Sequence, residues 1–194
     1  AVDQAAQDGT TPLMIATQQG HREVAQALRA ADFFKAIRDH NVARVTELLQ
    51  QDGSLLEKVM ARDNGQGALR ERTPLMYAAQ LGDTALVSFL LEQGAAVNQA
   101  QKEGATPLAI AAQQGHLEVV QYLVGHGAKV DQANHKGATP LWVAAGNGHL
   151  ATVQYLVQQG AGIKLANKSG ATPLSMATQQ GHGEVVQYLA EHGA

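Results

Sequence analysis

The chain has 194 residues, 45% hydrophobic but only 4% aromatic, so we expect a core of Ala, Leu, Val and Ile. The net charge is -3 with acidic and basic residues interspersed, which excludes the basic surface of a nucleic-acid partner. The absence of cysteine excludes disulfides, thiolate chemistry and cysteine metal sites. There is no apolar run of about 18 residues and no charged-then-apolar leader. We therefore expect a cytoplasmic protein that has no membrane partner.

A Thr-Pro-Leu triplet recurs along the chain, and the last four copies are each 33 residues apart, whereas the first gap is 62 residues. A fixed period of this length predicts a stack of similar units. The triplets begin at Thr11, Thr73, Thr106, Thr139 and Thr172. The predicted units are residues 1–30, 31–67, 68–100, 101–133, 134–166 and the incomplete 167–194.

The first unit is joined to the second without a loop, because only four residues separate Leu28 from Phe33. The segment His21–Asp39 contains no Gly or Pro and is rich in Ala, Leu, Arg and Glu, which favour a helix. We therefore predict one continuous helix from about His21 to His40, roughly 30 Å long.

The second unit departs from the repeat. Phe33–His40 and Val42–Gln50 are predicted to be helical, but the Thr-Pro start is missing and the outer face is polar, as in a solenoid cap. The loop that follows, residues 51–72, is nine residues longer than the loops between later units. Within it we predict a short helical turn at Ser54–Met60 and a chain turn at Asp63-Asn64-Gly65.

The regular unit is shown most clearly by residues 101–133. Thr106 is expected to cap a first helix that begins at Pro107. Gly115 ends this helix and permits a left-handed turn. A second helix, from about Leu117 to Val124, has an apolar stripe at helical spacing. One such unit cannot bury its own apolar face, so neighbouring units must stack.

The same segments return from unit to unit. In residues 101–133 they are Gly104–Leu108, Ala111–Ala112, Gly115–Val120 and Gly127–Ala128. They recur at Thr139–Ala161 and Thr172–Ala194, and in variant form at Thr73–Ala95 and Thr11–Leu28. In this pattern the chain resembles the ankyrin-repeat family. The family often has His after Thr-Pro-Leu, where this chain has Met14, Met76, Ala109, Trp142 or Ser175.

The resemblance implies an all-α solenoid of stacked helix-turn-helix units with short hairpin-like loops. It also implies a non-catalytic protein-interaction scaffold. In that family, partners bind a concave groove made by loop tips and first helices. The corresponding residues are Gln80, Lys102, Gln113, Gln114, His135, Lys136, Trp142, Asn147, Lys168, Gln179 and Gln180. Trp142 suits a binding anchor, and burial against neighbouring first helices is an equally good interpretation of it.

The first and last units share one repeat phase. Residues 1–5 continue the pattern that stops at Ala194, just as Lys129–Ala133 continue their own unit. We therefore expect residues 1–30 to be a repeat displaced from a position after residue 194, in a rearranged or engineered array. Four linker residues span about 14 Å, whereas five or six stacked layers span on the order of 50 Å.

This mismatch favours stacking of residues 1–30 on the last unit of another copy, head to tail, in a ring or a filament. The partner is then another copy of the same chain. The predicted self-association residues are Val2, Leu13, Val24, Leu28, Val185, Val186 and Leu189. The alternative is an ordinary array with an irregular middle repeat, acting as an adaptor that binds an unrelated protein in the groove.

Four histidines, His21, His116, His149 and His182, occupy one repeat position. They are expected about one layer apart, too far to share a metal ion at bond lengths of about 2 Å. We interpret them as residues that brace the loops. No carboxylate pair or nucleophile motif is present, so the sequence predicts no enzyme activity, metal or cofactor.

Overall fold

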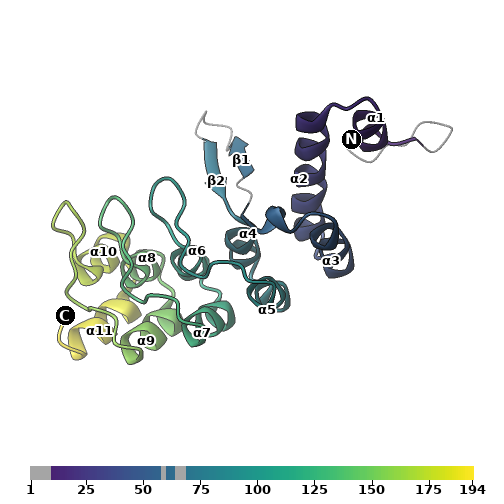
Figure 1. Cartoon of the computed structure of the whole chain (residues 1–194). Helices are drawn as coiled ribbons and strands as arrows, with labels where there is room; N and C mark the ends of the chain where they lie inside the picture. Colours follow the sequence, from purple (N-terminus) through teal and green to yellow (C-terminus); the bar gives the residue numbers. More distant parts are fainter. Residues whose placement is uncertain (1–9, 58–59, 64–68) are drawn as a thin grey trace. The chain divides into compact units, whose positions relative to one another are not determined.

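In a computed structural model, residues 10–57, 60–63 and 69–194 of the chain are described, and the side chains of residues 57–71 are not. The described residues form eleven α-helices, one 3-10 helix and one short pair of strands (Figure 1). The helical repeats confirm the predicted all-α fold class. The chain divides into two compact units, Ala1–Pro74 and Leu75–Ala194.

The first unit is organised around one long helix, α2, which packs against α1 and α3. Its aromatic residues Phe33 and Phe34 are buried and meet edge to face, with ring centroids 6.0 Å apart. Leu48 and Leu55 complete the same core. The elements of this unit are α1 (Pro12–Gln18), α2 (Arg22–Arg38), α3 (Val42–Gln51), the 3-10 helix Gly53–Glu57, β1 (Met60–Asp63) and β2 (Leu69–Arg72).

Helix α2 confirms the continuous helix predicted across the junction. Its 17 residues span about 25 Å at the usual rise per residue. His40, at the position where the regular repeats have a glycine such as Gly115, takes the left-handed conformation with φ 53°. The first repeat is therefore joined to the second by helix, without a connecting loop.

The long loop differs from its prediction. A helical turn is present as the 3-10 helix Gly53–Glu57. The chain then forms two antiparallel strands, which pair Met60 with Arg72 and Asp63 with Leu69. The sequence does not predict these strands, because each is only four residues long, too short for an alternating pattern to emerge. Asn64 and Gly65 of the predicted turn lie outside the described residues.

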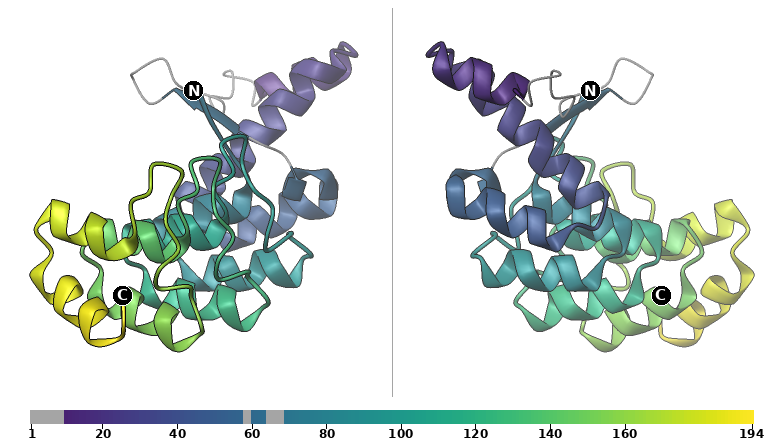
Figure 2. Two further views of the ribbon diagram at one scale, coloured as in Figure 1. Left: turned by 90° about the vertical axis from the view of Figure 1, so that its left-hand side faces the viewer. Right: turned by 90° about the vertical axis from the view of Figure 1, so that its right-hand side faces the viewer.

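The second unit consists of stacked helical hairpins in two layers (Figure 2). Helices α6, α8 and α10 pack side by side in one layer, and α5, α7, α9 and α11 pack in the other. The loops between hairpins project beyond the first of these layers (Figure 1). The helices are α4 (Pro74–Leu81), α5 (Thr84–Glu92), α6 (Pro107–Gln114), α7 (Leu117–Gly125), α8 (Pro140–Gly146), α9 (Leu150–Gln158), α10 (Pro173–Gln180) and α11 (Gly183–Glu191).

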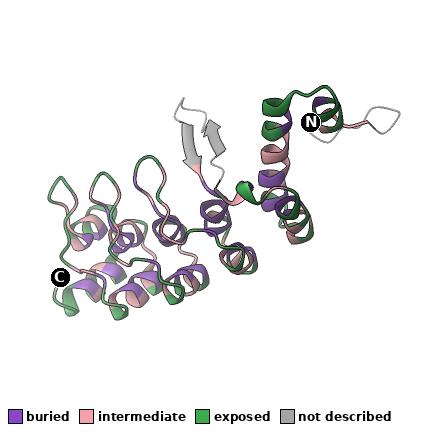
Figure 3. Cartoon of the chain, viewed as in Figure 1, coloured by how far each residue is buried: buried purple, intermediate pink, exposed green. Residues whose placement is uncertain are grey.

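The helix ends form as the repeat sequence predicts. The Thr106 side chain accepts a hydrogen bond from the backbone N–H of Ala109 at 3.2 Å, and Pro107 occupies the first turn. Thr139 and Thr172 cap their helices in the same way. Between the layers, Val119, Val120 and Leu123 are fully buried. Figure 3 shows this buried stripe repeating from hairpin to hairpin.

Candidate interaction surfaces

Three histidines tie neighbouring repeats of the second unit together. Each ring Nε2 lies within hydrogen-bond distance of a carbonyl at the end of the preceding first helix. A backbone carbonyl only accepts, so Nε2 is the donor in each ring. These helix-end carbonyls would otherwise have no partner. The pairs are His116 with Gln80 at 3.1 Å, His149 with Gln113 at 3.0 Å and His182 with Gly146 at 3.1 Å.

The same rings cover a glycine of the preceding repeat. The glycines have φ near +75°, and a Cβ added at any of them would come within 2.7 Å of the histidine Nδ1. Only glycine fits such a position, because it adopts a positive φ without strain and has no Cβ that would collide with the histidine ring. The pairs are Gly82 with His116, Gly115 with His149 and Gly148 with His182. The interpretation of these three histidines as bracing residues is confirmed.

Two members of this series have no counterpart within the described chain. Gly181, the next glycine, has φ +78° and no atom within 4 Å of an added Cβ. The nearby Gln179 carbonyl accepts no hydrogen bond from any residue that the structure describes. His21, the fourth histidine, is exposed at the start of α2. The last described repeat therefore has an unfilled position of this series, and the first described repeat has an unused histidine.

The first hairpin exposes a set of apolar side chains that other repeats bury. Val24 is 53% exposed, whereas Val119 and Val185 at the same repeat position are 0% and 1% exposed. Met14 and Ile15 are 54% and 41% exposed. Their counterparts in later repeats include Met76 and Ile110, which are buried. We call Ile15, His21 and Val24 the leading face. Met14 is not part of it, because its counterpart Trp142 bonds to the following repeat.

The last hairpin shows which positions meet a following repeat. Val186 is half-buried, whereas Val120 and Val153 at the same position are fully buried. Leu174 is half-buried, whereas Leu108 and Leu141 are buried. We call Leu174, Gln179, Gly181 and Val186 the trailing face.

By the same comparison, Val185 is buried although no described repeat follows it, so this position faces the preceding repeat. Val24 occupies the corresponding position in the first repeat. The leading face is therefore the side of a repeat that lies on a preceding one.

The predicted self-association residues fall into distinct environments. Val24 is exposed, and Leu13, Leu28 and Val186 are half-buried. Val185 and Leu189 are buried inside the second unit, and Val2 lies outside the described residues. Ile15 and Leu174 are not among the residues predicted from the sequence. Comparison with their buried counterparts in the regular units is the signal that identifies them.

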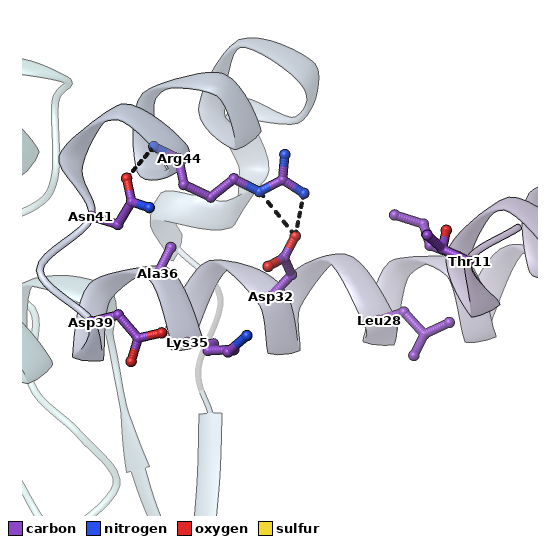
Figure 4. Close-up of a pocket in the computed structure, with 9 residues that line it drawn as sticks. Thr11, Leu28, Asp32, Lys35, Ala36, Asp39, Asn41 and Arg44 are labelled. Carbon is purple, nitrogen blue, oxygen red and sulfur yellow. Dashed lines mark hydrogen bonds and ion pairs between the residues drawn. The ribbon is translucent and has the colours of Figure 1, made fainter. Parts of the chain in front are cut away.

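A hollow in the first unit lies beside α2, between its junctions with α1 and α3 (Figure 4). Thr11 and Leu28 line one end of the hollow. At the other end the Arg44 guanidinium pairs with Asp32, with Nε to Oδ2 at 3.2 Å. Hydrogen bonds to Glu47 and then to Asp32 raise the pKa of Arg44 above its ordinary value. The pair fastens α3 to α2, so we assign this end of the hollow a structural role.

The predicted groove residues are mostly at the surface. Trp142 is half-buried, and its Nε1 donates to the Ala171 carbonyl of the next repeat at 2.9 Å. The indole therefore holds two repeats together, as its burial interpretation expects. Gln80 is also half-buried. The exposed members are Lys102, Gln113, Gln114, His135, Lys136, Asn147, Lys168, Gln179 and Gln180.

The loop tips form one shallow hollow, lined by His135, Lys136, Asn167, Lys168 and Ser169. Its charged side chains are two lysines. Among the described side chains, no group of three or more His, Asp or Glu residues could hold a metal ion. Over the same residues, no helix is both long and apolar enough to cross a membrane.

Comparison with known protein families gives two matches. The family described as "Ankyrin repeats (3 copies)" matches residues 33–134 and 129–194. The family described as "Ankyrin repeat" matches residues 8–40, which include α1 and α2. Comparison with the curated proteins finds no match.

Proposed function

We propose, since the chain belongs to the ankyrin-repeat family, that it is a non-catalytic protein-interaction scaffold whose main partner is a second copy of itself. In this assembly the leading face of one copy stacks on the trailing face of the next. The observation that carries the proposal is the exposure of Val24, at a position that the later repeats bury against a preceding repeat.

Energetic considerations support this contact. Full burial of a Val, Ile or Met side chain stabilises by about 1.5–3 kcal/mol. Because Ile15 and Val24 are roughly half exposed, covering them would contribute on the order of 1 kcal/mol each. Leu174 and Val186 add smaller areas from the other copy. These contributions offset part of the cost of bringing two molecules together, which is about 4–15 kcal/mol.

The residues of the two faces also specify what kind of surface covers them. The positions of Val24 and Ile15 are those that an ankyrin repeat places on its predecessor, and Leu174 and Val186 are those it places on its successor. Two different faces meet, so the contact is heterologous and continues into a ring or a filament. A chain with both faces is complementary to its own copies.

The proposal is tested by the mass of the chain as a function of concentration, measured by light scattering or sedimentation. We expect the mass to rise above that of one chain between low and high micromolar concentration. Val24→Glu places a charge in the contact and should leave a monomer. Leu165→Glu is the matched control, because Leu165 is similarly exposed at 44% but lies in a loop outside both faces.

A wild-type chain that stays monomeric at high micromolar concentration would overturn the proposal. The exposed groove residues would then be the surface to examine for an unrelated protein partner. Equal association of the Val24→Glu and Leu165→Glu variants would also overturn it, because the leading face would then have no part in the contact.

A further inference from the structure

We infer that His21 of one copy seats on Gly181 of the next, with its ring Nε2 donating a hydrogen bond to the Gln179 carbonyl. This inference rests on the proposed head-to-tail association and names the polar contact that fixes its register. Apolar faces alone can slide, whereas a directional hydrogen bond beside a glycine-sized seat permits one alignment.

The register follows from the three contacts inside the second unit. Each acceptor lies 33 residues after the one before it, from Gln80 to Gln113 to Gly146. The next position in this series is Gln179. The covered glycines advance by the same interval, and the next position is Gly181. The trailing face thus carries the glycine and the acceptor carbonyl that together make up a histidine seat, and no described histidine occupies it.

His21 has the local structure of the histidines that already occupy such seats. Its backbone angles are φ -77° and ψ 70°, compared with -78° and 80° at His116 and -84° and 73° at His182. Gly20 before it has φ +73°, like the glycines before the other histidines. The His21 N–H bonds to the Ala16 carbonyl at 2.9 Å, as the His116 N–H bonds to Ala111 at 3.1 Å. The ring is therefore presented as in the interior repeats.

Apart from His116, His149 and His182, which already occupy such positions, no other described histidine follows a left-handed glycine. His126 and His192 stand at the ends of second helices, and their Nδ1 atoms contact the Tyr122 and Tyr188 carbonyls. His135 lies at a loop tip. His21 is the histidine that combines the exposed ring, the preceding left-handed glycine and the apolar neighbours of the leading face.

The first test removes the donor. His21→Ala should weaken self-association about three- to tenfold, the usual effect of losing one net hydrogen bond, and should leave the apolar contact in place. His126→Ala is the control, because it removes an exposed histidine that lies on neither face. The readout is the dissociation constant from sedimentation of the full chain.

The second test fills the seat. Gly181→Ala and Gly160→Ala introduce the same strain, because both glycines have positive φ, +78° and +85°, with open space around an added Cβ. Only the methyl group at position 181 would lie where His21 is to sit. We expect Gly181→Ala to weaken association tenfold or more and Gly160→Ala to leave it unchanged. In a His21→Ala background the Gly181→Ala change should cost much less, because the ring is gone.

The outcomes separate this inference from the proposed function. A monomeric wild-type chain overturns both. If the wild type associates and the His21→Ala and Gly181→Ala variants associate equally well, the histidine seat is wrong while head-to-tail stacking stands. Weakening by both variants, with non-additive effects in the double variant and none in the controls, supports the seat.

Discussion

The glycine at the end of each first helix should be irreplaceable wherever a histidine covers it, and Gly115→Ala tests this. Alanine in the left-handed region costs about 1–2 kcal/mol. The added Cβ would also lie 2.5 Å from the His149 Nδ1, so the ring must leave. Its bond to the Gln113 carbonyl would then be lost, at a net cost of about 0.5–1.5 kcal/mol. We expect a total destabilisation of about 2–3 kcal/mol.

Gly160→Ala is the matched control inside the same unit. Gly160 has φ +85° and no atom within 4 Å of an added Cβ, so the variant reports the backbone strain alone. Its expected cost is about 1–2 kcal/mol. The difference between the two variants, on the order of 1 kcal/mol, measures the histidine contact.

Urea unfolding followed by circular dichroism and by the fluorescence of Trp142, the single tryptophan, gives both free energies of unfolding. The same measurement on His149→Ala and on the double variant closes a double-mutant cycle. We expect Gly115→Ala to cost about 1 kcal/mol less once His149 is absent. Equal costs for Gly115→Ala and Gly160→Ala, together with additivity in the cycle, would refute the reasoning.

Two further predictions concern the packing of single elements. Ala31→Pro interrupts α2 at its centre and should destabilise the first unit by about 3 kcal/mol, whereas Ala31→Leu should retain the helical circular dichroism signal. A helical signal unchanged by proline would show that α2 is not continuous. Trp142→Phe removes the Nε1 bond to the Ala171 carbonyl and should cost about 1 kcal/mol in thermal unfolding. A melting temperature equal to that of the wild type would show that this bond does not stabilise the fold.

The sequence predicts the elements better than the contacts between them. The caps at Thr106 and Gly115 and the continuous helix α2 depend on neighbouring residues, so local patterns identify them. The pairing of β1 with β2 joins two segments that have no individual strand signal, and it was missed. The exposure of Val24 is likewise invisible in the sequence, where Val24 is indistinguishable from the buried Val119.

The histidine position illustrates the same limit at the site. The sequence shows four histidines in one phase and predicts that they brace loops. It does not show that three of them reach the carbonyl 36 residues earlier and cover a glycine. Only that geometry reveals Gly181 as an empty seat and His21 as its candidate occupant.

Cross-linking between two single-cysteine variants tests the head-to-tail contact most directly, because the chain has no cysteine of its own. Arg22→Cys lies beside His21, and Gln179→Cys lies at the proposed acceptor. A bismaleimide that spans about 10 Å, the spacing of one helix layer, should link the two variants when they are mixed. Neither variant should link to itself. Efficient linking of Arg22→Cys to itself, or no link between the two variants under conditions where the chain associates, would contradict the head-to-tail contact.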